Sequence, residues 1–197
     1  MIEEHRLPIL HDHYKETFGH IQSYLKLRDR LFAYLLLTVT VMLFQMYSPT
    51  GSTEAISELL TKKLELKTPI DVSFLSSVVW FVLLSLVVRY FQTVVHVERQ
   101  YDYIHKIEDE LSTEYGRKAF TREGKSYLEN YPLFSSWAWV LYTIVFPLLL
   151  SIVVVTKIVG EIRQSDGITV LLSINAVVAL GILLSCSLYA LLVHFKK

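Results

Sequence analysis

Four polar side chains follow a long apolar run at intervals of three, four and three residues: Arg89, Gln92, His96 and Arg99. In a helix these intervals place all four on one stripe of the surface. An imidazole exchanges protons near neutral pH, and a guanidinium binds phosphate oxygens in a bidentate way. The stripe therefore suits three roles: an anchor to lipid phosphates, a polar seam between helices or subunits, or a catalytic pair.

Arg89 and His96 also have a loose Arg-x(4–6)-His spacing that resembles the pattern of HEPN-type ribonucleases. The resemblance implies that His96 would move a proton while Arg89 stabilises charge on an RNA phosphodiester. The segment from Arg6 to His11 fits the same spacing, which shows how often two such residues meet it by chance. A membrane-tethered ribonuclease is kept as an alternative, and the chain is expected not to be an enzyme.

Whether these side chains meet lipid or water depends on the apolar runs around them. Hydrophobic residues make up 52% of the 197-residue chain, and the mean hydropathy is +0.39. Four long runs carry few or no charges, and each can cross a hydrocarbon core about 30 Å thick as a helix. The sequence predicts an all-α integral membrane protein with four transmembrane helices, in which the second span continues as a long cytoplasmic helix.

The alternation of apolar and polar segments divides this single membrane domain, residues 1–197. In chain order we predict a cytoplasmic amphipathic helix at 1–30, a first span at 31–48, an outer loop with a short amphipathic helix at 49–70, a second span at 71–95, a cytoplasmic helical extension at 96–135, a third span at 136–157, an outer loop at 158–167 and a fourth span at 168–194. The N-terminal helix is expected to run on into the first span or to lie along the membrane surface. Within the extension, Gly116 is a predicted helix stop, and a further short helix is predicted at 121–132.

Positive charge is distributed unevenly among the polar segments. Of the 19 lysines and arginines, 14 lie in the N-terminal segment, the central segment and the C-terminal tail, and five lie in the two other connections. Cytoplasmic segments carry the excess of Lys and Arg. We therefore predict a multi-pass protein of the bacterial inner membrane with both termini cytoplasmic. The first apolar run follows a polar segment and is expected to be a permanent anchor.

Two amide side chains lie inside the predicted spans, Gln45 in the first and Asn175 in the fourth. Such amides either bond across a helix interface or line a pore, and both roles stay open. Pro147 is expected to kink the third span, because proline frees a backbone carbonyl. No charged residue lies in the middle of a run, which argues against a proton or ion path.

The composition gives no sign of a cofactor, a metal or a nucleic acid. The formal net charge is zero, so no direct nucleic-acid binding is expected. Cys186 is the single cysteine, and His11 and His13 do not share a helix face. No phosphate loop, nucleophile elbow or zinc motif is present. We predict neither a cofactor nor a metal site.

The cytoplasmic extension concentrates acidic side chains at Glu108, Asp109 and Glu110. A solvated helix face accounts for them, and a docking surface for a protein partner is the functional interpretation. Four spans with short connections leave large lipid-facing surfaces and spare polar residues, which favours a homo-oligomer in the bilayer.

Several segments together carry a resemblance to a known group. They are "YIHKIEDELS" from Tyr103, "TREGKSYLENYP" from Thr121 and "WAWVLYTIVFP" from Trp137, together with the Arg89/His96 pair. In size and layout the chain resembles small bacterial four-span membrane proteins and, among them, the accessory proteins encoded beside the type VI-B CRISPR RNA-guided ribonuclease. The resemblance implies a non-enzymatic accessory or effector in antiphage defence that oligomerises and perturbs or gates the membrane, with the RNA-guided nuclease as cytoplasmic partner. The alternative is a channel or transporter subunit for a small solute.

Overall fold

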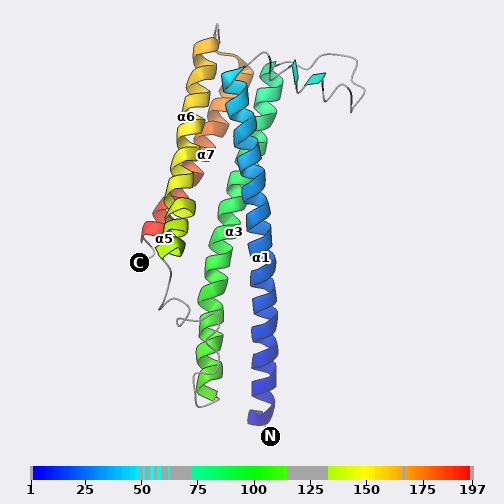
Figure 1. The fold of residues 1–197 in the computed structure, drawn as a ribbon, viewed down its shortest axis with the longest axis vertical. Helices are drawn as coiled ribbons and strands as arrows, with labels where there is room; N and C mark the ends of the chain where they lie inside the picture. Colours follow the sequence, from blue (N-terminus) through cyan, green and yellow to red (C-terminus); the bar gives the residue numbers. More distant parts are fainter. Residues whose placement is uncertain are drawn as a thin grey trace. The chain divides into compact units, whose positions relative to one another are not determined.

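The computed structural model is all-helical over the residues it describes, which are 2–48, 51, 54–55, 57–58, 62, 72–114, 133–165 and 167–195 (Figure 1). The elements in chain order are α1 (Ile2–Tyr47), α3 (Val72–Glu114), α5 (Leu133–Val140), the π-helical turn η1 (Leu141–Val145), α6 (Phe146–Gln164) and α7 (Val170–Phe195). No strand occurs in these ranges.

Four stretches of helix are long and apolar enough to cross a membrane. They are Leu7–Tyr47, Ser73–Thr113, Trp137–Gln164 and Val170–Val193. Each is longer than the roughly 20 residues that a bilayer core requires. The all-α class and the four candidate spans predicted from the sequence are confirmed in this sense, by length and composition.

Two of the helices continue well beyond their apolar runs. The polar N-terminal segment and the first apolar run form one unbroken helix, α1, and the second run continues through "HVERQYDYIHKIEDELSTE" as α3. Both predicted continuations are therefore confirmed. The physical reason is that neither junction contains a glycine or proline that would end the helix. The predicted stop at Gly116 and the predicted helix at 121–132 lie outside the described residues.

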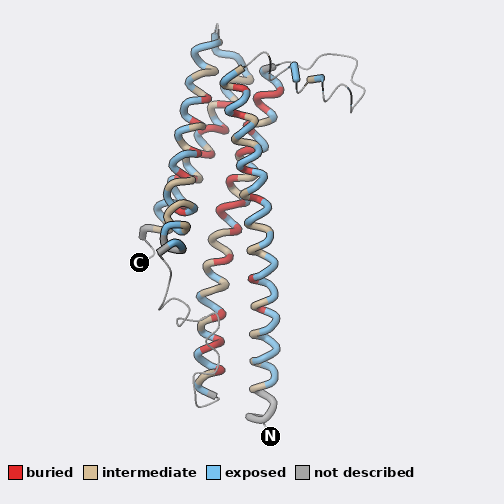
Figure 2. Tube along the Cα trace, in the orientation of Figure 1, coloured by how far each residue is buried: buried red, intermediate tan, exposed pale blue. Residues whose placement is uncertain are grey.

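The chain consists of two compact units, of which the first comprises Met1–Arg30 and Tyr90–Val140. Its core contains Ile21 of α1 and four apolar residues of α3, all buried (Figure 2): Val97, Ile104, Ile107 and Leu111. Intervals of seven, three and four residues place the α3 members on one helix face. Burying each such side chain stabilises the unit by about 1.5–3 kcal/mol.

The second unit comprises Leu31–Arg89 and Leu141–Lys197. Its core is drawn from four helices and consists of Leu35, Met42, Trp80, Leu83, Val87, Leu150, Val154 and Ile182. Large apolar side chains are also exposed on the same helices, among them Leu37, Phe44, Phe81, Ile152, Leu180 and Leu184. Apolar residues on both the inner and outer faces are typical of helices surrounded by lipid.

A widened turn precedes Pro147 in the third candidate span. The backbone of Leu141–Val145 is π-helical, and Pro147 is the second residue of α6. Proline has no N–H, so the carbonyl of Thr143, four residues earlier, cannot receive the usual α-helical bond. The sequence predicted a kink at this proline, and the structure shows the accompanying irregularity as a π-turn.

Two connections differ in detail from the segments predicted for them. Helix α6 continues to Gln164, so most of the outer loop predicted at 158–167 is helical. In the loop predicted at 49–70, the described residues Glu54, Ala55, Ser57, Glu58 and Lys62 are helical. Lys62 Nζ lies 2.8 Å from Glu58 Oε1, and this ion pair lowers the pKa of Glu58 and raises that of Lys62.

Candidate functional site

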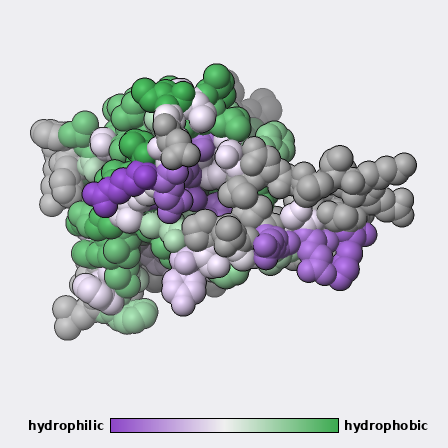
Figure 3. All heavy atoms as spheres, turned by 90° about the horizontal axis from the view of Figure 1, so that it is seen from above, coloured by the Kyte–Doolittle hydropathy of each residue, from purple (hydrophilic) through white to green (hydrophobic). Residues whose placement is uncertain are grey.

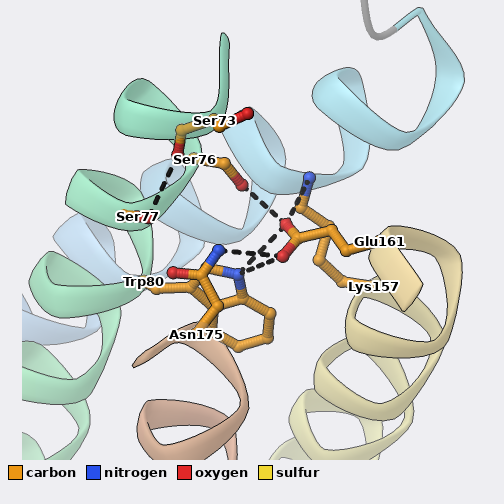
Figure 4. Close-up of polar contacts among 7 residues, drawn as sticks. All are labelled: Ser73, Ser76, Ser77, Trp80, Lys157, Glu161 and Asn175. Carbon is orange, nitrogen blue, oxygen red and sulfur yellow. Dashed lines mark hydrogen bonds and ion pairs between the residues drawn. The ribbon is translucent and has the colours of Figure 1, made fainter. Parts of the chain in front are cut away.

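A cluster of polar side chains lies inside the second unit, where three helices converge on one carboxylate (Figure 4). Its members are Ser76 and Trp80 of α3, Lys157 and Glu161 of α6, and Asn175 of α7, called here the Glu161 cluster. Lys157 is 7% exposed and Asn175 4% exposed. The side chain of Glu161 is 16% exposed. Such burial is unusual for charged groups, which are seldom inside unless paired.

Every neighbour in the cluster donates to Glu161. Ser76 Oγ donates to Oε1 over 2.6 Å, Trp80 Nε1 over 3.1 Å, and Asn175 Nδ2 donates to Oε2 over 2.9 Å. Lys157 Nζ lies 3.2 Å from Oε1. A carboxylate that accepts this many hydrogen bonds is held in one orientation. The Lys157 ammonium supplies the opposite charge, so the pair is electrically neutral.

The local helical period accounts for this geometry. Lys157 and Glu161 are four residues apart on α6, and Ser76 and Trp80 are four residues apart on α3, so each pair occupies one face of its helix. The first pair supplies the ions and the second supplies two donors. Breaking a buried ion pair by removing one partner typically costs about 3–5 kcal/mol. The three helices are joined by the hydrogen bonds that Ser76, Trp80 and Asn175 donate to Glu161.

Two amide oxygens beside the cluster have no hydrogen-bond partner among the described residues. They are Gln45 Oε1 and Asn175 Oδ1, both on buried side chains. The orientation of the Asn175 amide follows from its neighbour, because a carboxylate only accepts and so requires the NH₂ group toward Glu161. A buried acceptor without a donor costs about 1–3 kcal/mol. The two oxygens therefore mark a place that favours a hydrogen-bond donor.

Both amides line a cavity of about 260 Å³ at this end of the second unit. Ser73, Lys157 and Glu161 line it too, as do Gln164 at the end of α6 and two residues of the α6–α7 connection, Ser165 and Thr169. A cavity of this size holds several water molecules, since one occupies about 30 Å³ in the liquid. The arrangement can bind water or a small polar group.

Comparison with known proteins finds no match. No family model, curated protein or solved structure is similar to this chain at a significant level. The interpretation of the cluster therefore depends on its geometry and chemistry.

The four residues of the predicted polar stripe lie on α3 and differ in their burial. Arg89, Gln92 and Arg99 are exposed, whereas His96 is half-buried. The His96 ring packs against Tyr24 of α1, with ring centroids 4.3 Å apart and planes tilted by 50°. Three members of the stripe are thus available to lipid or to another subunit, while His96 takes part in the packing of the first unit.

The acidic residues predicted as a docking surface divide into two kinds. Asp109 and Glu110 are exposed, but Glu108 is 3% exposed. Tyr14 Oη of α1 donates a hydrogen bond to Glu108 Oε1 over 3.2 Å. Glu108 therefore holds α1 and α3 together within the first unit. The docking prediction needs this correction: helix periodicity turns Glu108 inward with Ile104 and Leu111, so Asp109 and Glu110 remain as the surface members.

Another contact in the first unit involves a histidine near the N-terminus. His13 Nε2 and Tyr103 Oη are 2.8 Å apart, and the two rings meet edge to face. Among the described residues, no three His, Cys, Asp or Glu side chains lie close enough together to hold a metal ion. His13 thus has a structural partner on α3.

The sequence interpretation found Gln45 and Asn175 but missed the charged pair between them. In the sequence, Lys157 lies at the edge of the third apolar run and Glu161 in the predicted outer loop, so neither charge stands inside an apolar run. The signal that could have found them is a Lys–Glu pair at i and i+4 directly continuing a helical run, with an amide in the next span. Ser76 and Trp80 gave no separate signal, since both are common in apolar helices.

Proposed function

We propose that this protein is a non-enzymatic accessory or effector of the bacterial inner membrane. It oligomerises in the bilayer, perturbs or gates it, and receives a cytoplasmic protein partner on its first unit. The observation that carries the proposal is that α1 and α3 continue beyond their apolar runs and share a core of their own in that unit. Asp109 and Glu110 of this helical pair are exposed. A helical pair with an exposed acidic face suits the binding of a protein partner.

The charge distribution supports a cytoplasmic position for this unit. Segments 1–30 and 90–140, which form it, contain most of the lysines and arginines of the chain, and cytoplasmic segments carry this excess. The exposed Arg89, Gln92 and Arg99 provide polar contacts near the membrane surface for a second copy of the chain. The resemblance to accessory proteins of the type VI-B CRISPR ribonuclease supports antiphage defence as the setting and the RNA-guided nuclease as the partner.

The docking role is tested by reversing charge on the exposed acidic face. We expect Asp109→Lys/Glu110→Lys to abolish co-purification of the RNA-guided nuclease and protection against phage, while the protein still reaches the membrane. The matched control is Asp12→Lys/Glu16→Lys, which makes the same charge change at two exposed positions of α1. If both double variants retain binding and protection, the docking role is wrong.

The membrane role has its own measurement. A potential-sensitive dye should report depolarisation when the protein and its partner are expressed during infection. A membrane potential that holds at high expression in infected cells would remove gating or perturbation from the proposal, and leave only the docking part.

A channel or transporter subunit is the second candidate, and the Glu161 cluster favours it. Buried ion pairs in membrane helices often mark the path of a solute or ion. Here the pair lines a polar cavity that reaches the α6–α7 connection. Uptake of small solutes into proteoliposomes tests this directly, with Glu161→Gln as the variant that should abolish uptake.

A further inference from the structure

A second cavity adjoins the first along α1 and α6 and differs from it in its walls. Its volume is about 380 Å³. It shares Gln45, Lys157, Glu161 and Gln164 with the first cavity, and its other walls include the exposed apolar residues Val155 and Val159. A polar cavity thus continues into a groove on the apolar outer surface of the second unit, called here the α1–α6 groove.

The groove has positive charge at its polar end. Arg163 lines it and is the basic residue in the last turn of α6. Lys157 lies six residues earlier on the same helix and is paired with Glu161. Glu161 neutralises the charge of Lys157. Among the described residues that line the groove, the guanidinium of Arg163 is then the charged group that Glu161 does not neutralise. Arginine binds phosphate oxygens bidentately and strongly.

Acceptors lie where the groove meets the first cavity. Gln45, which lines both, and Asn175, which lines the first cavity, each have a buried amide oxygen with no donor among the described residues. Glu161 already accepts from four neighbours. These two amide oxygens are therefore the acceptors of the site that still lack a hydrogen-bond donor. A ligand that fits therefore has an anionic phosphate for the basic residues and N–H or O–H groups within reach of the amides.

The position of the groove along the helix matches the headgroup layer of a bilayer. The third candidate span, Trp137–Gln164, contains 28 residues and so measures about 42 Å, against a hydrocarbon core of about 30 Å. The span is therefore long enough for the last turns of α6 to reach the headgroup level with Val155 and Val159 beside acyl chains. From above, hydrophilic residues gather amid hydrophobic ones on the face of the molecule that is in view (Figure 3).

We propose that the α1–α6 groove binds a phospholipid whose headgroup carries hydrogen-bond donors, an ethanolamine or glycerol headgroup. Its phosphate pairs with Arg163, its headgroup donors reach Gln45 and Asn175, and its acyl chain lies along Val155 and Val159. A choline headgroup has no N–H or O–H donor and fits poorly. This inference is independent of the proposed docking function, because it concerns only the second unit.

Gly160 makes a clean test possible. It lines the groove, and a Cβ added to it would meet no atom within 4 Å. We expect Gly160→Leu to occupy part of the groove, and the substitution raises helix propensity. Gly19→Leu is the matched control, since Gly19 lies in α1 within the first unit and also has open space around its Cα.

The experiment measures lipid retention by native mass spectrometry after the full-length protein is extracted from bilayers of equal ethanolamine, glycerol and choline phospholipids. We expect the first two to be retained about tenfold over choline lipid. Gly160→Leu should lose this excess, Gly19→Leu should keep it, and Arg163→Gln should lower retention of both severalfold. Helicity and thermal midpoint of each variant show that it is folded.

Three results would overturn the proposal. Equal retention of choline lipid would show that the amide oxygens do not select donors. Unchanged retention in Gly160→Leu would show that lipid lies elsewhere. Displacement by soluble phosphoethanolamine at equimolar concentration would show that the site takes a free phosphate ester and gains nothing from an acyl chain.

Discussion

Tyr14 and Glu108 are 94 residues apart in sequence and joined by a hydrogen bond of 3.2 Å between the tyrosine hydroxyl and a carboxylate oxygen. The contact ties the N-terminal half of α1 to the C-terminal half of α3. Glu108 is buried among the apolar residues that form the core of this unit. A polar contact in such a place fixes the register of two helices, because sliding either by one turn would leave the carboxylate without this donor.

Removing the hydroxyl should therefore weaken the first unit. We expect Tyr14→Phe to lower the free energy of unfolding by about 0.5–1.5 kcal/mol, the net contribution of one hydrogen bond. Thermal and denaturant unfolding in detergent measure it. Tyr34→Phe, at an exposed position of α1, is the control and should change little. Equal stability of the two variants would mean that this hydrogen bond contributes nothing.

The ion pair of the Glu161 cluster should show strong coupling. We expect Glu161→Gln to destabilise the protein by about 3–5 kcal/mol, because the buried Lys157 loses its counter-charge. Adding Lys157→Met should recover part of the loss, and a double-mutant cycle measures the coupling. The exposed pair Glu58 and Lys62 is the control, where Glu58→Gln should have no measurable effect. If the two substitutions change the free energy of unfolding additively, Lys157 and Glu161 do not interact energetically.

The approach of α3 to α7 depends on a small residue. A Cβ on Gly181 would lie 3.5 Å from Leu84 Cδ1, an ordinary contact. We expect Gly181→Ala to be tolerated and to stabilise by about 0.5–1 kcal/mol through helix propensity. Gly181→Phe should instead cost about 1–3 kcal/mol by overpacking. Unfolding midpoints measure both, and a tolerated phenylalanine would show that the two helices are not held at this distance.

The orientation can be measured with single cysteines in a Cys186→Ser background. We expect Gly167→Cys to react with a membrane-impermeant maleimide in intact bacteria whose outer membrane has been made permeable. Asp109→Cys should react only after the inner membrane is opened as well. Both positions are exposed, so reactivity reports the side of the membrane. The reverse labelling pattern would invert the topology and place the first unit outside the cell.

The helical fold could be predicted from the sequence, since four long apolar runs each specify a helix by their length alone. The continuation of α3 past Arg99 followed from the spacing of Val97, Ile104 and Leu111. The end of α6 could not be located, because "KIVGEIRQ" combines charged and apolar residues and carries a glycine, which is typical of a loop as well as of a helix.

The candidate site was less accessible to prediction for a different reason. Gln45 and Asn175 stood out as amides in apolar runs, but Glu161, to which Asn175 donates, belongs to another helix. Which face of α6 meets α3 and α7 is decided by packing across helices distant in sequence, and periodicity alone does not fix it. Glu108 is a different case, because its intervals of four from Ile104 and three from Leu111 already place it on the apolar face of α3, which Asp109 and Glu110 do not share.

Gln45, Lys157, Glu161 and Gln164 line both cavities. If a molecule bound in one cavity attracts one of these side chains, that side chain loses a contact in the other cavity. Thermodynamic linkage requires that such an effect be reciprocal, so each occupant alters the affinity of the other by the same factor. Through these shared side chains, the binding of a water-soluble molecule in the first cavity is energetically coupled to the binding of a lipid in the α1–α6 groove.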